Sequence, residues 1–180
     1  NACLPRERLG VPIYDSLDAL IEFGASEEYY IASGALQSMK NHRNRHESKG
    51  NGFGYIVVND PNNPSAYSNA VLATGGSGKE RNLIYDFQPN IGGQVVKGKK
   101  SPLNDEGVRY MTPREWGKLQ GFINYGFVDP VSGVDRFGFP EKISKTQQYK
   151  MFGNAVTIPT VQTMAEYMTA CFAKLAVGTA

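Results

Sequence analysis

The last quarter of the chain carries the most regular pattern of apolar positions. Apolar side chains recur there at spacings of three and four, which is the period of one face of an α-helix. The pattern predicts a helix over about residues 156–176. Burying such side chains stabilises by roughly 1.5–3 kcal/mol each, so we expect either the chain's own core or a partner to cover them. The apolar stripe consists of Val161, Met164, Ala165, Met168, Cys171, Phe172 and Leu175.

Weaker patterns mark the elements of the first half. Apolar positions in the segment VPIYDSLDALIEF suggest a short helix, and EEYYIA at 27–32 is typical of a strand. We expect Ser33 to cap a helix that runs to about Glu47, with Leu36 and Met39 on its inward face. Over residues 50–100, short apolar runs alternate with Gly, Pro and Asn, which predicts short strands joined by turns. These runs are GNGFGYIVV, NAVLATGG, NLIYDF and GGQVVKGKK.

The segment TPREWGKLQGF, residues 112–122, predicts a helix with unusually complete end signals. Thr112 is a good N-cap, Pro113 suits the first helical position, and Glu115 completes a capping box with Thr112. Trp116 then lies on the apolar face, and Gly121 can end the helix. Such a short helix would not need this specification at the surface, so we expect Arg114, Glu115 and Gln120 to be ordered by contacts.

Composition indicates one domain, or one domain with an appendage, that can bury a core. The chain has 180 residues, of which 41% are hydrophobic, and its 20 Gly and 10 Pro exceed what a plain helical bundle carries. The sequence contains no run of 18 apolar residues, so it predicts no membrane-spanning helix. The two cysteines show no pairing or zinc-binding pattern, so a reducing, cytoplasmic setting is expected. The start, NACLPRERLG, has neither an initiating Met nor a signal sequence and suggests part of something longer.

Charge is divided unevenly along the chain. Residues 1–32 hold two arginines against six carboxylates, a net charge of −4. Because the whole chain has a net charge of +2, the remaining 148 residues carry +6. Part of that excess lies in KNHRNRHESK, where a solvated helix end could contact phosphates. His42 and His46 are spaced to share a metal, but no further ligand completes a set, so no metal site is expected. The phosphate-binding candidates are Lys40, Arg43, Arg45 and Lys49.

A second candidate surface follows a glycine-rich turn. GGSGKERN supplies Lys79, Arg81 and Asn82, whose donors and acceptors suit phosphates and base edges. GNGFG lacks the spacing of a nucleotide-binding loop and is more typical of a turn. No Ser–His–Asp set, pair of catalytic carboxylates or CxxC can be assembled from the sequence. We therefore assign no catalytic residue to this chain.

Two segments, RYMTPREWGKLQGF and QQYKMFGNAVTIP, resemble the ninth and tenth motifs of the DNA (cytosine-5) methyltransferases, in the right order and separation. The region between Tyr29 and Asp86, with HESKGNGFGY and GGSGKERNL, looks like the target-recognition domain of that family, so the resemblance covers nearly the whole chain. The matching positions are Arg109, Thr112, Arg114, Glu115, Leu119, Gln120, Gly121 and Phe122, then Tyr149, Lys150, Gly153, Asn154, Ala155, Val156 and Pro159.

The resemblance implies an α+β fold in which a small, irregular, β-rich recognition domain has flanking helices. Its terminal helix would pack on a Rossmann-like catalytic domain supplied by a partner. The family's early motifs, including the Pro-Cys nucleophile and the S-adenosylmethionine glycine loop, are absent from the sequence. The chain therefore looks like the second polypeptide of a split enzyme, or its C-terminal half, inactive alone. The implied divisions are a lead-in over 1–32, the recognition domain over 33–108 and the ninth and tenth motifs over 109–180.

The resemblance implies methylation of a cytosine flipped out of double-stranded DNA, as part of bacterial restriction–modification. S-adenosyl-L-methionine would be bound mainly by the partner, with Asn154 and Ala155 near its amino-acid end, just ahead of a helix whose N-terminus favours an anion. The resemblance adds Asn51 and Thr74 as candidate readers of bases. A usual Thr-Leu pair is replaced by Val71-Leu72, which loses a hydroxyl contact or shifts it to Thr74. A freestanding DNA-binding protein and an RNA-directed relative are the alternatives.

Overall fold

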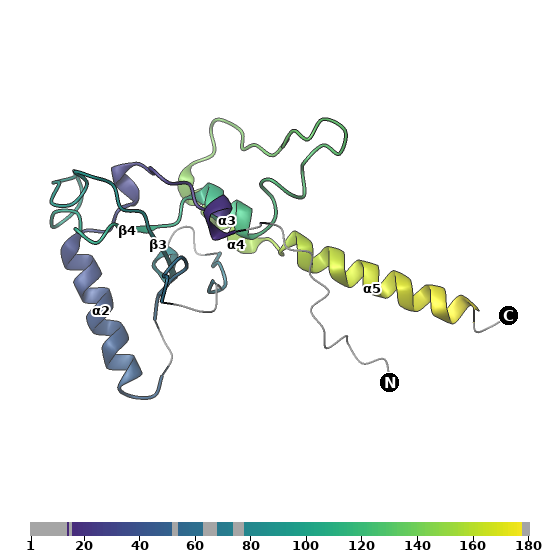
Figure 1. Ribbon diagram of the computed structural model, residues 1–180, viewed down its shortest axis with the longest axis horizontal. Helices are drawn as coiled ribbons and strands as arrows, with labels where there is room; N and C mark the ends of the chain where they lie inside the picture. The colour runs from purple at the N-terminus through teal and green to yellow at the C-terminus, as the bar shows by residue number, and fades with distance from the viewer. Residues whose placement is uncertain (1–13, 15, 52–53, 63–67, 74–77, 178–180) are drawn as a thin grey trace.

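The computed structural model describes residue 14 and residues 16–51, 54–62, 68–73 and 78–177. It confirms a mixed architecture of helices and one small sheet. Figure 1 shows α2 extending from one side of a central body and α5 from the other. The helices are α1 (Leu17–Leu20), α2 (Ser33–Glu47), α3 (Pro113–Leu119), α4 (Lys145–Asn154) and α5 (Ile158–Val177), with 3-10 turns η1 (Glu27–Tyr29) and η2 (Lys79–Arg81).

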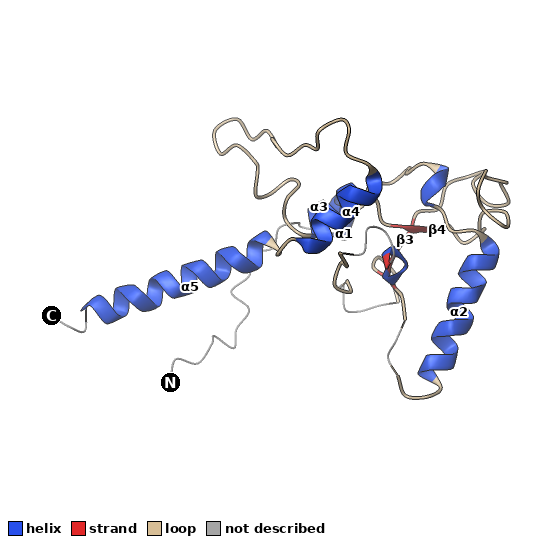
Figure 2. Cartoon of the chain, turned by 180° about the vertical axis from the view of Figure 1, so that it is seen from behind, coloured by secondary structure: helices blue, strands red, loops and turns tan. Residues whose placement is uncertain are grey.

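The sheet has three short strands in the order β1-β3-β4 (Figure 2). β1 (Ile56–Val57) pairs parallel with β3 (Asn82–Tyr85), and β3 pairs antiparallel with β4 (Val108–Tyr110). The prediction of further strands fails in two described segments. EEYYIA forms η1 and two isolated bridges, and the segment 92–100 forms turns. In EEYYIA, turn hydrogen bonds take the N–H groups of Tyr29 and Tyr30, while Ile31 pairs with distant backbone, at Val108 and Asn104.

Successive residues of the strands point into two separate cores, as the alternation of a sheet requires. Leu83 and Val57 lie in a cluster with Leu36 of α2, which confirms the predicted inward position of Leu36. The next residue along β3, Ile84, lies in the other cluster, beside Trp116 of α3. The sheet therefore joins the α2 side of the molecule to the α3–α4 side.

The predicted helix boundaries are largely correct, with two differences. α2 covers the expected residues, but its N-cap is Ala32 and not Ser33. Ser33 is the first helical residue, and its hydroxyl instead donates to Ser101 Oγ. The second difference is α4, which the sequence did not predict. Ser144 caps it, and Tyr149 and Phe152 are its buried residues. Tyr149 packs on Trp116 and Phe152 lies among other aromatic rings, so surfaces from elsewhere in the chain stabilise this helix.

The terminal helix α5 leaves its apolar stripe uncovered by the described residues. Val161, Met168 and Phe172 are 50%, 53% and 64% exposed, and both ribbon views show the helix leaving the central body. Of the two expectations for this stripe, coverage by the chain's own core is wrong. The preceding residues contact the first turns of α5, where Tyr125 donates to Gln162 and Gln120 accepts from the N–H of Ile158, but they leave the stripe beyond exposed.

Candidate nucleic-acid interface and its support

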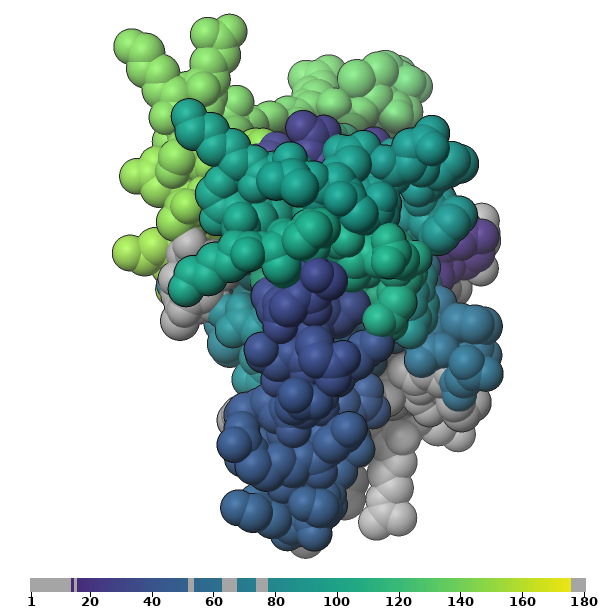
Figure 3. Space-filling view, turned by 90° about the vertical axis from the view of Figure 1, so that its left-hand side faces the viewer, coloured from purple at the N-terminus to yellow at the C-terminus, as the bar shows by residue number. Residues whose placement is uncertain are grey.

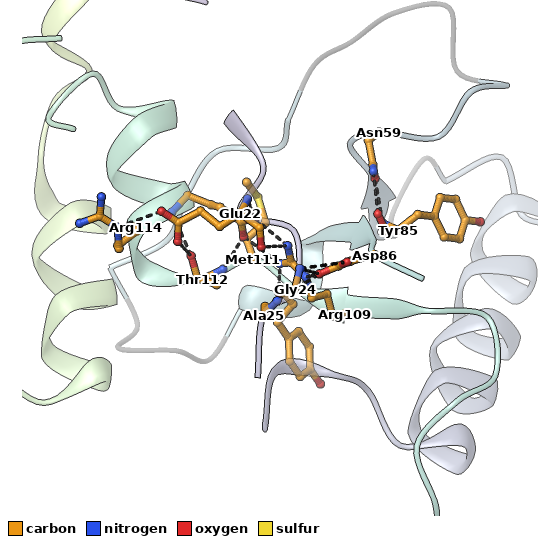
Figure 4. Close-up of polar contacts among 12 residues, drawn as sticks. Glu22, Gly24, Ala25, Asn59, Tyr85, Asp86, Arg109, Met111, Thr112 and Arg114 are labelled. Carbon is orange, nitrogen blue, oxygen red and sulfur yellow. Dashed lines mark hydrogen bonds and ion pairs between the residues drawn. The ribbon is translucent and has the colours of Figure 1, made fainter. Parts of the chain in front are cut away.

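A buried arginine links the sheet to the ninth-motif helix. Arg109 of β4 is 0% exposed, and its Nε donates to Asp86 Oδ2 at 2.8 Å (Figure 4). Its Nη1 and Nη2 donate to the two carboxylate oxygens of Glu115 at 2.9 and 2.8 Å. Burial acts to raise the pKa of Asp86, but the hydrogen bond and charge of Arg109 outweigh it and lower that pKa. One guanidinium thus holds two buried carboxylates.

The same network fixes the segment that precedes η1. The backbone N–H of Glu22 donates to Glu115 Oε1 at 2.8 Å, and Arg109 Nη2 donates to the carbonyl oxygen of Glu22 at 3.1 Å. The N–H of Gly24 donates to Asp86 Oδ2 at 3.1 Å. Segments distant in sequence are therefore joined by one set of charge-assisted hydrogen bonds. Asp86 is the member of this set that the sequence did not indicate, because no local pattern pairs it with Arg109.

The ends of α3 confirm the predicted capping. Thr112 Oγ1 accepts from the N–H of Glu115, and Glu115 Oε2 accepts from the N–H of Thr112. Gly121 follows the helix with a φ of +75°, in the left-handed region that glycine tolerates. Arg114 departs from the expectation of internal order: its side chain is 58% exposed and pairs with Glu22. It faces outward because the carboxylates inside are already held by Arg109.

Gln120 connects the ninth motif to the turn after α4. Its side-chain oxygen accepts from Thr157 Oγ1 at 2.6 Å, and its backbone oxygen accepts from the N–H of Ile158 at 2.9 Å. Asn154 is exposed and is the last residue of α4, while Ala155 is the C-cap. The predicted position of Asn154 just ahead of a helix N-terminus is therefore wrong, since α5 starts four residues later. The Asn154 side chain is exposed.

The basic candidates on α2 differ in how far their charge is offset. Lys40 pairs with Glu106, and Arg43 pairs with Glu47 at 2.6 Å while lying over the ring of Tyr55. Arg45 and Lys49 are exposed near the C-terminal end of the helix. Figure 3 shows α2 standing out from the body, so its end is accessible on this face. Free phosphate attraction is therefore expected mainly from Arg45 and Lys49.

The candidates around η2 occupy three different environments. Lys79 Nζ lies 4.6 Å from the centroid of the Tyr110 ring, and Arg81 is half-buried. Asn82 is only 1% exposed, and its amide exchanges hydrogen bonds with the backbone of Asn69 at 2.7 and 2.9 Å. Burial therefore removes Asn82 from the set of base readers and makes it a structural residue.

The other two candidates near the turns give less geometric information. Asn51 is exposed, and its backbone N–H donates to the carbonyl oxygen of His46 at 3.0 Å. This leaves its side chain at the surface, as a reader of bases requires. Thr74 lies outside the described residues.

A cavity of about 460 Å³ between the start of α2 and β4 adds residues that sequence reasoning missed. Lys99, Lys100 and Ser101 line it beside Tyr110. Burial and the neighbouring Lys79 lower the pKa of Lys99. Three lysines within KGKK are a charge cluster that could have indicated this patch, but the segment was assigned to a strand instead.

Two further expectations concern metals and membranes. The rings of His42 and His46 lie 4.3 Å apart. No group of three or more His, Cys, Asp or Glu side chains that could hold a metal occurs among the described residues. Within the same part of the chain, no helix is both long enough and apolar enough to cross a bilayer.

Comparison with known proteins identifies the class. The model of the C-5 cytosine-specific DNA methylase family matches residues 12–170. The Type II methyltransferase M.HpaII of Haemophilus parainfluenzae is 38% identical over 160 residues, covering 82% of this chain and 38% of that protein. The DNA-cytosine methyltransferase of Escherichia coli (strain K12) is 29% identical over 172 residues, covering 93% and 32%.

Two other matches are more distant or shorter. The tRNA (cytosine(38)-C(5))-methyltransferase of Mus musculus is 33% identical over 78 residues, covering 43% of this chain and 15% of that protein. The solved structure of the Entamoeba histolytica methyltransferase EhMeth has a TM-score of 0.49 at 15% identity and covers 87% of this chain and 41% of that chain.

The family model and the Haemophilus parainfluenzae relative show the family of this chain. The chain belongs to the C-5 cytosine-specific DNA methylase family. It spans about a third to two-fifths of the length of the two DNA methyltransferases named above.

Proposed function

We propose that this chain is the DNA-recognition part of a site-specific DNA (cytosine-5) methyltransferase and acts with a catalytic part that carries the early motifs. The observation that carries the proposal is the family match over residues 12–170, combined with coverage of only 38% of M.HpaII. The remainder of such an enzyme must supply the nucleophile and most of the cofactor site. Whether that remainder is a separate subunit or another segment of one polypeptide does not change the role assigned here.

The uncovered stripe of α5 is the proposed contact with the catalytic part. Five of its side chains, Val161, Met164, Met168, Phe172 and Leu175, are at least half exposed. Covering them would stabilise an interface by several kcal/mol at roughly 25 cal/mol per Å² of apolar surface. A contiguous apolar surface of this kind on a DNA-modifying protein favours association over exposure to water.

On the recognition side, the exposed cations of α2 would contact phosphates, while Lys79, Arg81 and Asn51 would face bases. Phosphate contacts position a protein on DNA and base contacts specify the sequence. Among the described residues, S-adenosyl-L-methionine would meet Asn154 and Ala155, whose exposed amide and turn backbone fit only the edge of a cofactor site. When bound, this cofactor supplies the methyl group. The division at residues 32 and 108 remains part of this proposal, as does a cytoplasmic location.

The test is methyl transfer from labelled S-adenosyl-L-methionine to duplex DNA. The chain alone and the catalytic part alone should each give no incorporation, and the mixture should restore it. Incorporation by this chain alone, or none by the mixture, would contradict the proposal. Duplex DNA, single-stranded DNA and tRNA in parallel separate the DNA activity from that named for the mouse relative, which matches only 43% of this chain.

A further inference from the structure

The tenth-motif helix meets the recognition side of the molecule at one very close backbone contact. Gly153 lies in α4, and a Cβ added to it would stand 2.2 Å from the carbonyl oxygen of Leu72 and 2.5 Å from the nitrogen of Ala73. Ordinary contacts of a Cβ begin near 3.4 Å. A helix interior does not itself favour glycine, which costs roughly 0.5–1 kcal/mol there relative to alanine. The glycine at 153 is therefore explained by this close approach.

The Leu72–Ala73 peptide that meets Gly153 is held from its other side at the start of η2 (Lys79–Arg81), which we call the recognition turn. The Leu72 side chain lies against Gly78, where an added Cβ would stand 2.7 Å from Leu72 Cδ1. Gly78 has a φ of +93° and is the N-cap of η2, which carries Lys79 and Arg81. Leu72 thus fills the space between α4 and the start of η2. The backbone contacts Gly153, and the side chain contacts Gly78.

Two further residues of the described segment 68–73 are held by contacts. Asn69 is hydrogen-bonded through both its N–H and its carbonyl oxygen to the buried amide of Asn82 at the start of β3. Val71 packs against the core cluster that contains Phe152 of α4. A shift of α4 relative to Leu72 cannot be absorbed by the loop without disturbing these contacts.

On its other side, Gly153 adjoins Asn154 and Ala155, the residues assigned to the cofactor side. The side chain of Gln120 donates to the carbonyl oxygen of Phe152 at 3.4 Å and accepts from Thr157, so the ninth motif holds this turn. Gly153 therefore lies between the segment that contacts the recognition turn and the turn that contains Asn154 and Ala155.

We propose that Gly153 is a positioning residue for target recognition. By admitting the Leu72–Ala73 peptide against α4, it sets where the Lys79–Arg81 turn stands relative to the catalytic part. The inference rests on the proposed function for its consequence, because a recognition turn has a target only in a DNA methyltransferase. The seating of the loop on Gly153 is independent of that function and is tested separately below.

Gly153→Ala forces the peptide to retreat by about 1.2 Å, the difference between 2.2 and 3.4 Å. A misplacement of about 1 Å can cost on the order of 100-fold in a rate that depends on geometry. We expect the KM for DNA to rise about tenfold or more, and methylation to spread from preferred to other sites. The KM for S-adenosyl-L-methionine should change by less than about twofold, because the variant loses alignment with DNA and no cofactor contact.

The experiment uses the full chain with its catalytic part. Steady-state kinetics are measured for both substrates, and site preference is read by bisulfite sequencing of a methylated plasmid. Hydrogen exchange of peptides covering residues 68–73 and 78–85 reports the seating of the loop. Gly138→Ala is the matched control, because a Cβ there would meet nothing within 4 Å. Leu72→Ala loosens the same seat from the recognition side without altering the tenth motif.

The outcomes distinguish the role of Gly153 from the proposed function of the chain. Faster exchange in the two peptides, a raised KM for DNA and relaxed site preference in Gly153→Ala, absent in Gly138→Ala, support the proposal. If hydrogen exchange in Gly153→Ala equals that in Gly138→Ala, the proposal for Gly153 is overturned. Absence of methylation by the wild type is a separate outcome that would refute only the proposed function. Equal loss toward both substrates also overturns it, since that indicates a general structural defect. If Gly153→Ala fails to fold, unchanged DNA kinetics and site preference in Leu72→Ala overturn it instead.

Discussion

Replacing Arg109 with Met tests the claim that the buried network holds the molecule together. The substitution keeps much of the apolar stem but leaves the carboxylates of Asp86 and Glu115, 3% and 0% exposed, without their cation. Removing one partner of a buried ion pair typically costs about 3–5 kcal/mol, because the remaining charge is uncompensated. That is a large part of the roughly 5–15 kcal/mol that stabilises a typical domain.

The measurement is urea unfolding followed by the fluorescence of Trp116, the single tryptophan and fully buried. Arg114→Met is the matched control, because that arginine makes an exposed ion pair with Glu22. Such pairs contribute about 0–1 kcal/mol. We expect the midpoint of Arg109→Met to fall far more than that of Arg114→Met. Equal losses in the two variants would refute the reasoning.

The pH dependence gives a second check with a definite sign. The pKa of Asp86 is lowered in the folded chain, so its stabilising contribution is present above the ordinary aspartate pKa of about 4 and is lost as pH falls through the folded value. In Arg109→Met the cation is lost, while burial and the N–H donors of Gly24 and Ala25 remain, so the pKa of Asp86 should rise above its value in the wild type. Protonation then relieves the unpaired charge, so the stability gap between wild type and variant should narrow from pH 7 to pH 4. A constant gap would show that the cost lies in packing.

Two further predictions concern association and DNA binding. Met168→Glu should prevent the chain from joining its catalytic part in size-exclusion chromatography. Trp116 fluorescence should stay native, because Met168 is 53% exposed; normal joining would exclude α5 as the interface. Arg45→Ala and Lys49→Ala should weaken binding to all duplexes alike and reduce the salt slope by about one each, whereas Arg81→Ala should cost about 1–3 kcal/mol at the target site only. Equal effects of all three on random and target DNA would remove Arg81 as a reader.

Elements whose causes lie within a few residues were predictable from the sequence. The capping box joins Thr112 to Glu115, three positions apart, and Gly121 ends the same helix by its own backbone preference. The inward position of Leu36 follows from the 3.6-residue period of α2. The residues of the ninth and tenth motifs also resembled the family, which the match over residues 12–170 confirms.

What depends on distant partners was decided only by the tertiary structure. Asp86 and Arg109 are 23 positions apart, and nothing local marks them as a buried pair. The sequence suggested Asn82 as a base reader, but its side-chain amide is buried and hydrogen-bonded to the backbone of Asn69. α4 lacks a strong apolar period and forms where Phe152 meets other aromatic rings. The apolar stripe of α5 was visible in the sequence, but whether anything covered it depended on where the rest of the chain packs. Periodicity fixes which side of a helix is apolar, whereas burial depends on surfaces brought together from other parts of the chain.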